Sequence, residues 1–248
     1  MNVALRLASI VLLLALWFAG AQLAGPRLLP SPQAVGLAIV TEARTGALAL
    51  NLGVTLARVF AAFSIAMVLG TMLGLVMGRS RTADRIGDPW LVLLLNLPAL
   101  VIIVLAYIWA GLTETAALAA VVLNKLPLAI VTVREGARAL DGGLDEMAQV
   151  FGINRWKRFR HVVLPQLSPY LAAASRSGLS LVWKIVLIVE LLGRSNGVGF
   201  EIGTAFQLFD VTKILAYALA FVAIMLAIET FVVQPFERYA SRWRPRPA

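Results

Sequence analysis

The sequence predicts an all-α, polytopic membrane protein with about six transmembrane helices and a structured elbow between the fourth and the fifth. Of its 248 residues, 60% are hydrophobic and only 14% are charged, which excludes an ordinary soluble surface. Nearly uncharged apolar runs recur along the chain, and most approach the roughly 20 residues that cross a hydrocarbon core. Because these runs lack the period-two alternation of a membrane barrel, we expect helices, which satisfy their own backbone hydrogen bonds in lipid.

The expected spans follow the apolar runs within a single domain, 1–248. They cover residues 7–23, 59–77, 90–112, 115–133, 174–192 and 214–233. The first run ends in Ala19-Gly20-Ala21, which has the form of a cleavage site, so a cleaved signal peptide is the alternative to a retained helix. After this run, Ser31 and Pro32 supply an N-cap and a first-turn proline, so we expect a short helix over 33–45 along the outer interface.

Glycine and proline residues punctuate the spans. Pro98 and Pro127 fall inside the third and fourth spans, where each removes a backbone donor. The second span carries Gly70, Gly74 and Gly78 at a spacing of four residues, so they share one face of the helix. We expect this small-residue ridge to allow close helix packing rather than to line a pathway.

Basic residues are distributed unevenly over the loops. With both termini placed in the cytoplasm, fourteen Lys and Arg residues fall inside and four outside, the bias expected of cytoplasmic loops. The inside set is Arg6, Arg79, Arg81, Arg85, the basic residues from Arg134 to Arg160, and Arg238, Arg242, Arg244 and Arg246; the outside set is Arg27, Arg44, Arg194 and Lys213. The net charge of +9 therefore reflects topology, and no nucleic-acid partner is indicated.

The connection between the fourth and fifth spans, 141–165, is too long and too structured for a simple loop. Asp145 and Glu146 suit the positive end of a short helix. Ala148 permits close backbone approach, and Gly152 can adopt the left-handed conformation that ends a helix. These residues predict a short helix with a defined start and stop.

A second helical turn is expected directly after this stop. Asn154 can cap it, and Trp156 and Phe159 follow among Arg155, Lys157, Arg158 and Arg160. The result is an elbow with apolar and basic faces at the cytoplasmic surface, which suits docking. The simpler alternative is that Glu146, Gly152 and Pro165 only mark a helix start, a helix stop and the first turn of the fifth span.

The pattern Glu-x-Ala-x3-Gly-x9-Val-x-Leu-Pro in this loop resembles the EAA signature of the permease subunits of bacterial ABC importers. The identities are Glu146, Ala148, Gly152, Leu164 and Pro165, while Val162 stands where isoleucine is usual and Met147 replaces the second alanine. Methionine is flexible and compatible with a helix, so this departure changes little.

The resemblance implies that this coupling loop docks on a separate ATP-hydrolysing subunit. The expected docking residues are Glu146, Ala148, Gly152, Trp156, Leu164 and Pro165. It further implies a multi-pass protein of the bacterial inner membrane that works as a homodimer with two ABC ATPase subunits and an external substrate-binding protein. The sequence has no Gly-x4-Gly-Lys-Ser/Thr phosphate loop, so we expect ATP and Mg on the partner subunit and no cofactor on this chain.

Three weaker motifs narrow the resemblance to the nitrate/sulfonate/taurine branch of these permeases. They are the run 51–63 before the second span, Asn96-Leu97-Pro98 in the third, and 195–200 after the fifth. This branch implies a small polar or anionic solute. Nitrate, sulfonates such as taurine, bicarbonate and thiamine-precursor pyrimidines all remain open.

Polar side chains inside spans are candidates for lining a pathway, because a charge at the centre of a span costs about 2.5–3.5 kcal/mol. The candidates are Asn96, Lys125, Trp183, Lys184 and Glu229. Our hypothesis is that Lys184, beside Trp183, faces the translocation route and favours an anionic or strongly polar substrate. The alternatives are a structural pair with Glu229 or a side chain that extends to the interface.

Other chemistry finds little support in the sequence. The chain has no cysteine, and its single histidine, His161, has no cluster of carboxylates around it, so we expect neither catalytic nor metal-binding residues. Glu190 and Arg194, four residues apart, suggest a pair at a helix end. The rival function is an ion-coupled secondary transporter or channel, which would take up solute without any ATPase.

Overall fold

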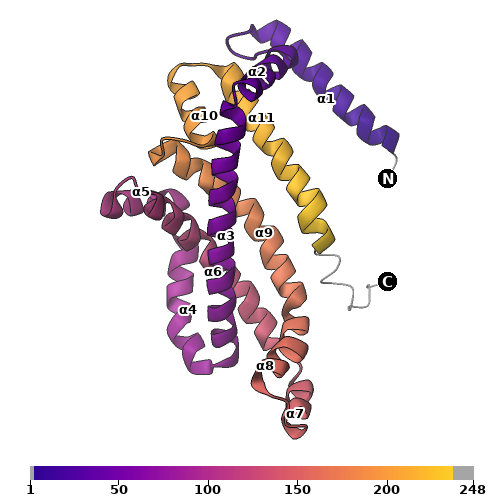
Figure 1. Ribbon diagram of the computed structural model, residues 1–248, viewed down its shortest axis with the longest axis vertical. Coiled ribbons are helices and arrows are strands. Elements are labelled where there is room, and N and C mark those ends of the chain that lie inside the picture. The colour runs from indigo at the N-terminus through magenta and orange to yellow at the C-terminus, as the bar shows by residue number, and fades with distance from the viewer. Residues whose placement is uncertain (1–2, 237–248) are drawn as a thin grey trace. The chain divides into compact units, whose positions relative to one another are not determined.

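The computed structural model describes residues 3–236, and within that range the chain forms helices and turns without a strand (Figure 1). The predicted all-helical class is therefore confirmed. The basic residues Arg238, Arg242, Arg244 and Arg246, which we assigned to the cytoplasmic side, lie outside the described residues.

The helices follow one another with short connections (Figure 1). They are α1 (Val3–Ala24), α2 (Pro32–Arg44), α3 (Ala47–Arg79), α4 (Arg81–Asn96), α5 (Ala99–Ala110), α6 (Glu114–Arg138), α7 (Gly142–Val150), α8 (Arg155–Arg158), the π-helical turn η1 (Phe159–Val163), α9 (Leu164–Gly193), α10 (Val198–Gln207), α11 (Val211–Ile228) and the π-helical turn η2 (Glu229–Val233). Two segments are continuous: α8, η1 and α9 form one rod, and α11 runs on through η2 to Phe236.

Four helices among the described residues are long and apolar enough to cross a membrane. They are Ala47–Arg79, Glu114–Arg138, the rod Arg155–Gly193 and Val211–Phe236. A fifth span results if α4 and α5, which meet at 98°, are counted together, and the apolar helix Ala8–Ala24 is shorter. The polytopic fold is confirmed, whereas the count of six spans is not.

The predicted third span, 90–112, is not one straight helix. It breaks where α4 ends at Asn96, and both Leu97 and Pro98 are extended, with ψ values of 127° and 134°. A proline disfavours the helical conformation of the residue before it and has no N–H to donate, so the chain turns here. Pro127 behaves differently and stays inside α6, where it is buried.

The chain divides into two compact units, which are described separately. The first contains residues 1–56 and 190–225, and the second contains 57–189 and 226–248. In the first unit, α2 begins as expected: Ser31 Oγ accepts the N–H of Ala34 at 3.3 Å, and Pro32 is the first helical residue. The indole of Trp17 donates to the carbonyl of Pro30 at 3.0 Å and so ties α1 to the segment that precedes α2.

The second unit has an apolar core built from α3, α5, α6 and α9. Its most buried members include Ala62, Ala66, Ile103, Ala117, Ala120, Val182 and Val186. The residues that α3 and α6 contribute to this core are mostly small, which brings the backbones of the two helices close together. The core therefore positions the spans of this unit through the packing of apolar side chains.

The glycine ridge of α3 packs against α6, as the spacing predicted. A Cβ atom added to Gly70 would lie 2.5 Å from that of Ala129, and one added to Gly78 would lie 2.5 Å from that of Ala137. One added to Gly74 would lie 2.8 Å from the backbone oxygen of Ile130. Since Cβ atoms do not approach other atoms this closely, only glycine permits this separation of the two helices.

We predict that Gly74→Val forces α3 and α6 apart. Its branched side chain meets the backbone of α6, which cannot yield as a flexible side chain would, and overpacking of this kind costs about 1–3 kcal/mol. Gly53→Val in the same helix is the control, because nothing lies within 4 Å of a Cβ at Gly53. In thermal unfolding in detergent, the midpoint temperature of Gly74→Val should be lower than that of Gly53→Val. Equal midpoints would contradict this packing.

Ion pairs join α4 to α6 in the second unit, which the sequence did not predict. Arg134 contacts Asp88 at 2.6 Å and Asp84 at 3.2 Å, and Arg138 contacts Asp84 at 2.5 Å. Arg134 is largely buried, so the carboxylates of Asp84 and Asp88 stabilise a charge that would otherwise be costly. The pairs fix the end of α6 immediately before the 141–165 segment begins.

Candidate functional site

The segment 141–165 forms a helical elbow made of α7, a turn, α8 and η1. Its first helix begins at Gly142 and not at the predicted Asp145 and Glu146, which lie in its middle. The reason is the side chain of Asp141, which accepts the N–H of Gly143 at 2.8 Å and so caps the helix earlier. The backbone N–H of Asp141 also donates to Gln166 Oε1 at 2.9 Å, which ties the start of α7 to α9.

The end of α7 is a Schellman turn centred on Gly152. The N–H of Ile153 donates to the carbonyl of Ala148 at 2.9 Å, and that of Gly152 donates to Gln149 at 3.0 Å. Gly152 has a φ of +62°, the left-handed conformation expected from the sequence. Ala148 is fully buried, in keeping with close backbone approach where α7 contacts η1.

The second arm of the elbow begins where Asn154 Oδ1 accepts the N–H of Trp156 at 3.2 Å. The rings of Trp156 and Phe159 stack with their centres 5.9 Å apart. The sequence predicted a helical turn here, and in the structure this turn continues through η1 into α9 as one rod of 39 residues. The π-helical turn lies just before Pro165, which has no N–H for a regular helical bond.

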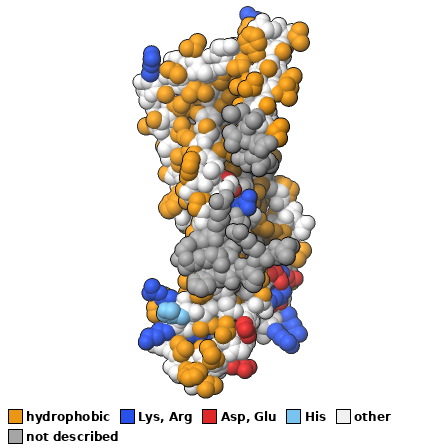
Figure 2. Space-filling view, turned by 90° about the vertical axis from the view of Figure 1, so that its right-hand side faces the viewer, with side chains coloured by type: hydrophobic (Ala, Val, Ile, Leu, Met, Phe, Trp, Pro, Cys, Tyr) orange, Lys and Arg blue, Asp and Glu red, His pale blue; other side chains and the backbone are white. Residues whose placement is uncertain are grey.

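Apolar side chains on the outside of the elbow are exposed. Val150 is 84% exposed, Phe151 75% and Trp156 67%, and Leu144 and Met147 are also accessible. Figure 2 shows hydrophobic side chains at the lower end of the molecular face that is in view, with basic side chains and the histidine just above them. We call Leu144, Met147, Val150, Phe151 and Trp156 the apolar face of the elbow. Exposed apolar patches rimmed by polar residues mark interaction sites.

The remaining predicted docking residues lie on the same elbow. Glu146 is exposed in the middle of α7, and Leu164 and Pro165 are exposed where η1 meets α9. His161 is exposed as well, and its Nδ1 lies 2.9 Å from the carbonyl of Lys157. No group of three His, Cys, Asp or Glu side chains that could hold a metal ion occurs among residues 3–236.

The five candidate pathway residues have different neighbours. Lys125 is fully buried and its Nζ donates to the carbonyl of Ala174 at 3.0 Å. Glu229 pairs with Arg176 at 3.5 Å, and Lys184 is exposed with its Nζ 5.5 Å from the centre of the Trp183 ring. The amide of Asn96 donates to the carbonyl of Val92 within its own helix. A pathway role for these residues stays a prediction.

A buried polar network in the first unit was missed by sequence reasoning. Asn51 Oδ1 accepts the N–H of Gly197 at 2.8 Å, and Thr55 Oγ1 accepts the N–H of Val198 at 2.8 Å. Thr55 and the N–H of Gly199 both donate to Glu190 Oε2, each at 2.9 Å. Two of the weak motifs, 51–63 and 195–200, are therefore in direct contact.

The network gives Glu190 partners that the sequence did not indicate. We expected Glu190 to pair with Arg194 at a helix end; its carboxylate is fully buried and is held by Thr55 and Gly199, while the pair with Arg194 stays a prediction. The available signal was the four-residue spacing of Asn51 and Thr55, which places both on one face of α3. Nothing local indicated which distant segment that face would meet.

These features define a class of protein: a helical, multi-pass membrane protein with an exposed apolar elbow between two of its spans. The family described as "Binding-protein-dependent transport system inner membrane component" matches residues 66–244, which include the whole elbow. The chain belongs to this family, and it is an ABC transporter permease.

Two of the similar curated proteins are named for solutes of the predicted branch. The chain is 31% identical over 219 residues to the putative aliphatic sulfonates transport permease protein SsuC of Escherichia coli, covering 88% of this chain and 83% of that protein. It is 27% identical to the taurine transport system permease protein TauC of the same organism, covering 98% of this chain and 90% of that protein. It is also 30% identical to the riboflavin transport system permease protein RibX of Chloroflexus aurantiacus, covering 95% and 88%.

Solved structures share the fold. An amino acid ABC transporter matches with a TM-score of 0.64 at 20% identity, covering 81% of this chain and 97% of that chain. The MetNI methionine ABC transporter matches with a TM-score of 0.62 at 20% identity, covering 75% and 92%. At this identity the likeness concerns the fold, and it confirms the helical permease architecture.

Proposed function

We propose that this chain is the permease subunit of an ATP-driven importer and that its elbow docks on a separate ATPase subunit. The observation that carries the proposal is the apolar face of the elbow, which is exposed on a helix that packs directly on the start of a membrane-spanning rod. Burial of a large apolar side chain is worth about 1.5–3 kcal/mol, so this surface favours a protein partner. In the proposed complex, ATP and Mg lie on that partner and this chain is not catalytic.

The continuity of α8, η1 and α9 suggests how movement of the ATPase subunit reaches the membrane. A displacement of α7 is passed to η1, against which α7 packs, and the 39-residue rod carries it into the bilayer. Rigid helices transmit such shifts because packed interfaces have discrete arrangements and do not deform continuously. We infer that the elbow is on the cytoplasmic side, with both termini on that side as well.

The family and its relatives support the remaining partners. A binding protein is expected at the outer face, and a second copy of the chain is expected to complete the pathway. The substrate is proposed to be a small polar or anionic solute such as a sulfonate or taurine, because two relatives are named for these. The relative named for riboflavin shows that permeases of similar identity differ in cargo, so the solute must be identified by uptake with the binding protein.

Copurification tests the docking proposal. We expect Val150→Asp with Phe151→Asp to reduce recovery of the co-expressed ATPase subunit by about tenfold or more, since two apolar groups that the proposed interface would bury become charged. The matched control is Leu208→Asp with Phe209→Asp, which changes two equally exposed apolar residues in the turn between α10 and α11. Equal recovery with both double variants would contradict docking through the elbow, and so would uptake by the chain without any ATPase.

A further inference from the structure

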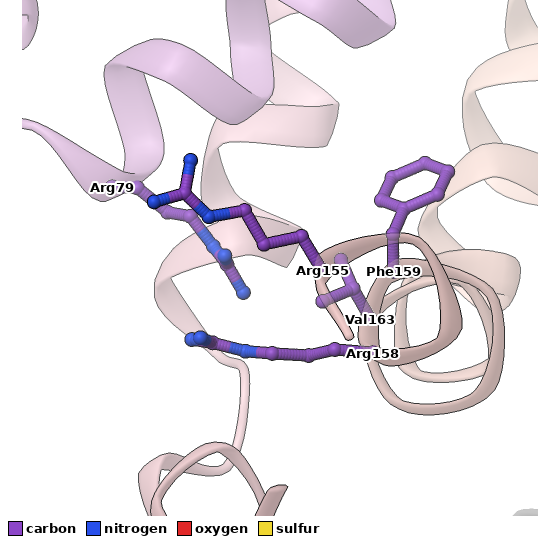
Figure 3. A pocket seen from close by; sticks show the side chains of 5 residues that line it. All are labelled: Arg79, Arg155, Arg158, Phe159 and Val163. Carbon is purple, nitrogen blue, oxygen red and sulfur yellow. The ribbon is translucent and has the colours of Figure 1, made fainter. Parts of the chain in front are cut away.

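A pocket lined by three arginines lies between the second arm of the elbow and the end of α3, in the second unit. It has a volume of about 380 Å³ and is lined by Arg79, Arg155, Arg158, Phe159 and Val163. Figure 3 shows the side chains of Arg155 and Arg158 extended from their helix toward Arg79, which comes from the end of α3. None of these residues belongs to the apolar face that we propose for docking.

The charges of this pocket suit a multivalent anion. Three guanidinium groups line one space, so their positive charges add in attracting a single anion placed there. Arg79 and Arg158 also make other contacts in the structure, so the pocket does not depend on unpartnered arginines. A planar guanidinium binds the oxygens of a phosphate group with two parallel hydrogen bonds, and several guanidiniums around one phosphate increase both affinity and specificity.

The size and position of the pocket favour a phosphate ester over a simple ion. A volume of about 380 Å³ is within the range of small-molecule sites, and the apolar side chains of Phe159 and Val163 offer contact to the rest of an ester. Arg79 is the last residue of α3, and the apolar run of that helix ends at Met77, so the pocket lies where a span leaves the hydrocarbon. Basic side chains at this level contact lipid headgroups.

We propose that Arg79, Arg155 and Arg158 form a binding site for a phosphate group, carried either by an anionic lipid headgroup or by a small soluble phosphate. A phosphate in this site contacts the end of α3 and the first turn of the rod at once. Its occupancy therefore holds the second arm of the elbow against the neighbouring span. The site is additional to the proposed docking function and does not require it.

Binding to the purified full-length chain tests the proposal in two arms. In the first, native mass spectrometry compares retention of phosphatidylglycerol with that of diacylglycerol of the same acyl chains. In the second, titration calorimetry compares sodium phosphate with sodium chloride at equal ionic strength. The test variant is the triple change Arg79→Gln, Arg155→Gln and Arg158→Gln. The control is Arg81→Gln, Arg85→Gln and Arg160→Gln, which removes the same charge from exposed residues outside the pocket.

The wild type and the control variant should bind the phosphate-bearing ligand about tenfold or more tightly than the test variant, because hydrogen bonds to charged groups are lost. Retention of phosphatidylglycerol alone identifies a lipid headgroup, and binding of inorganic phosphate identifies a soluble ligand. If the test variant is not monodisperse, the corresponding triple lysine variant replaces it and should bind more weakly than wild type.

Two results would overturn the proposal. In one, neither arm distinguishes the test variant from the control variant. In the other, the test variant binds phosphatidylglycerol and inorganic phosphate as the wild type does but no longer copurifies with the ATPase subunit. That result would mean that an acidic side chain of that partner occupies the pocket. Because the apolar-face variants leave all three arginines in place, they separate failure of this site from failure of the docking proposal.

Discussion

Replacing Gly197 with alanine is expected to cost about 3 kcal/mol or more of stability, since strain and loss of a buried hydrogen-bond network add. Gly197 has a φ of +109° and a ψ of 168°, a conformation that is essentially restricted to glycine. A Cβ at this position would also lie 2.5 Å from both carboxylate oxygens of Glu190. The alanine variant must therefore displace either the 195–200 turn or the buried carboxylate that holds it. Thermal unfolding of the full-length chain in detergent measures the loss.

Gly46→Ala separates the two contributions. Gly46 also has a positive φ, +80°, but nothing lies within 4 Å of a Cβ at this position. In this control variant the free energy of unfolding should fall only by the cost of a left-handed backbone at alanine, about 1 kcal/mol. Equal losses for Gly46→Ala and Gly197→Ala would show that the network around Glu190 contributes nothing measurable.

Replacing Gly152 with valine is expected to reduce ATP-driven uptake severely while leaving the membrane helices folded. The left-handed conformation at Gly152 closes α7, and a branched side chain disfavours it by about 1–2 kcal/mol or more. Since nothing lies within 4 Å of a Cβ at Gly152, the effect comes from the backbone and is confined to the elbow. Uptake by proteoliposomes that contain the ATPase subunit and the binding protein measures it.

Gly152→Asn is the matched variant for this prediction. Asparagine tolerates the left-handed conformation better than other residues with a side chain, so uptake should remain close to that of the wild type. If valine and asparagine reduce uptake equally, the shape of the turn is not what matters. If valine reduces uptake only by lowering the melting temperature of the whole chain, the elbow is not a separate functional element.

Local signals in the sequence predicted local structure well. The N-cap of α2 at Ser31, the left-handed turn at Gly152, the cap at Asn154 and the glycine ridge of α3 all depend on residues within one or two helical turns. The family and its branch could also be predicted, because the elbow pattern lies within a continuous stretch of 20 residues, from Glu146 to Pro165.

The features that could not be predicted depend on competition between local signals or on contacts between residues far apart in the sequence. Asp141 was a stronger cap than the acidic residues that follow it, so α7 begins earlier than expected. The length of the rod could not be foreseen, because a short capped turn and the first turn of a long helix have the same local pattern. Hydropathy alone treated 90–112 as one span, although Pro98 allowed the bend that the structure shows.

The buried network is the clearest example of a contact between residues far apart in the sequence. Gly197 is separated from Asn51 by 146 residues, and their hydrogen bond depends on how α3 meets the 195–200 segment within the first unit. The four-residue spacing of Glu190 and Arg194 near a helix end suggested a local partner. Only the tertiary arrangement shows that Thr55 and a backbone N–H bind its carboxylate.

Site-specific crosslinking tests the central claim most directly, because the chain contains no cysteine and a single introduced thiol is unambiguous. Phe151→Cys places the thiol on the exposed apolar face of the elbow, and Phe209→Cys places it on an equally exposed turn of the other unit. With a short thiol-reactive crosslinker and the co-expressed ATPase subunit, we expect a crosslinked product from Phe151→Cys that mass spectrometry identifies as this chain joined to that subunit. A product from Phe209→Cys and none from Phe151→Cys would contradict docking through the elbow.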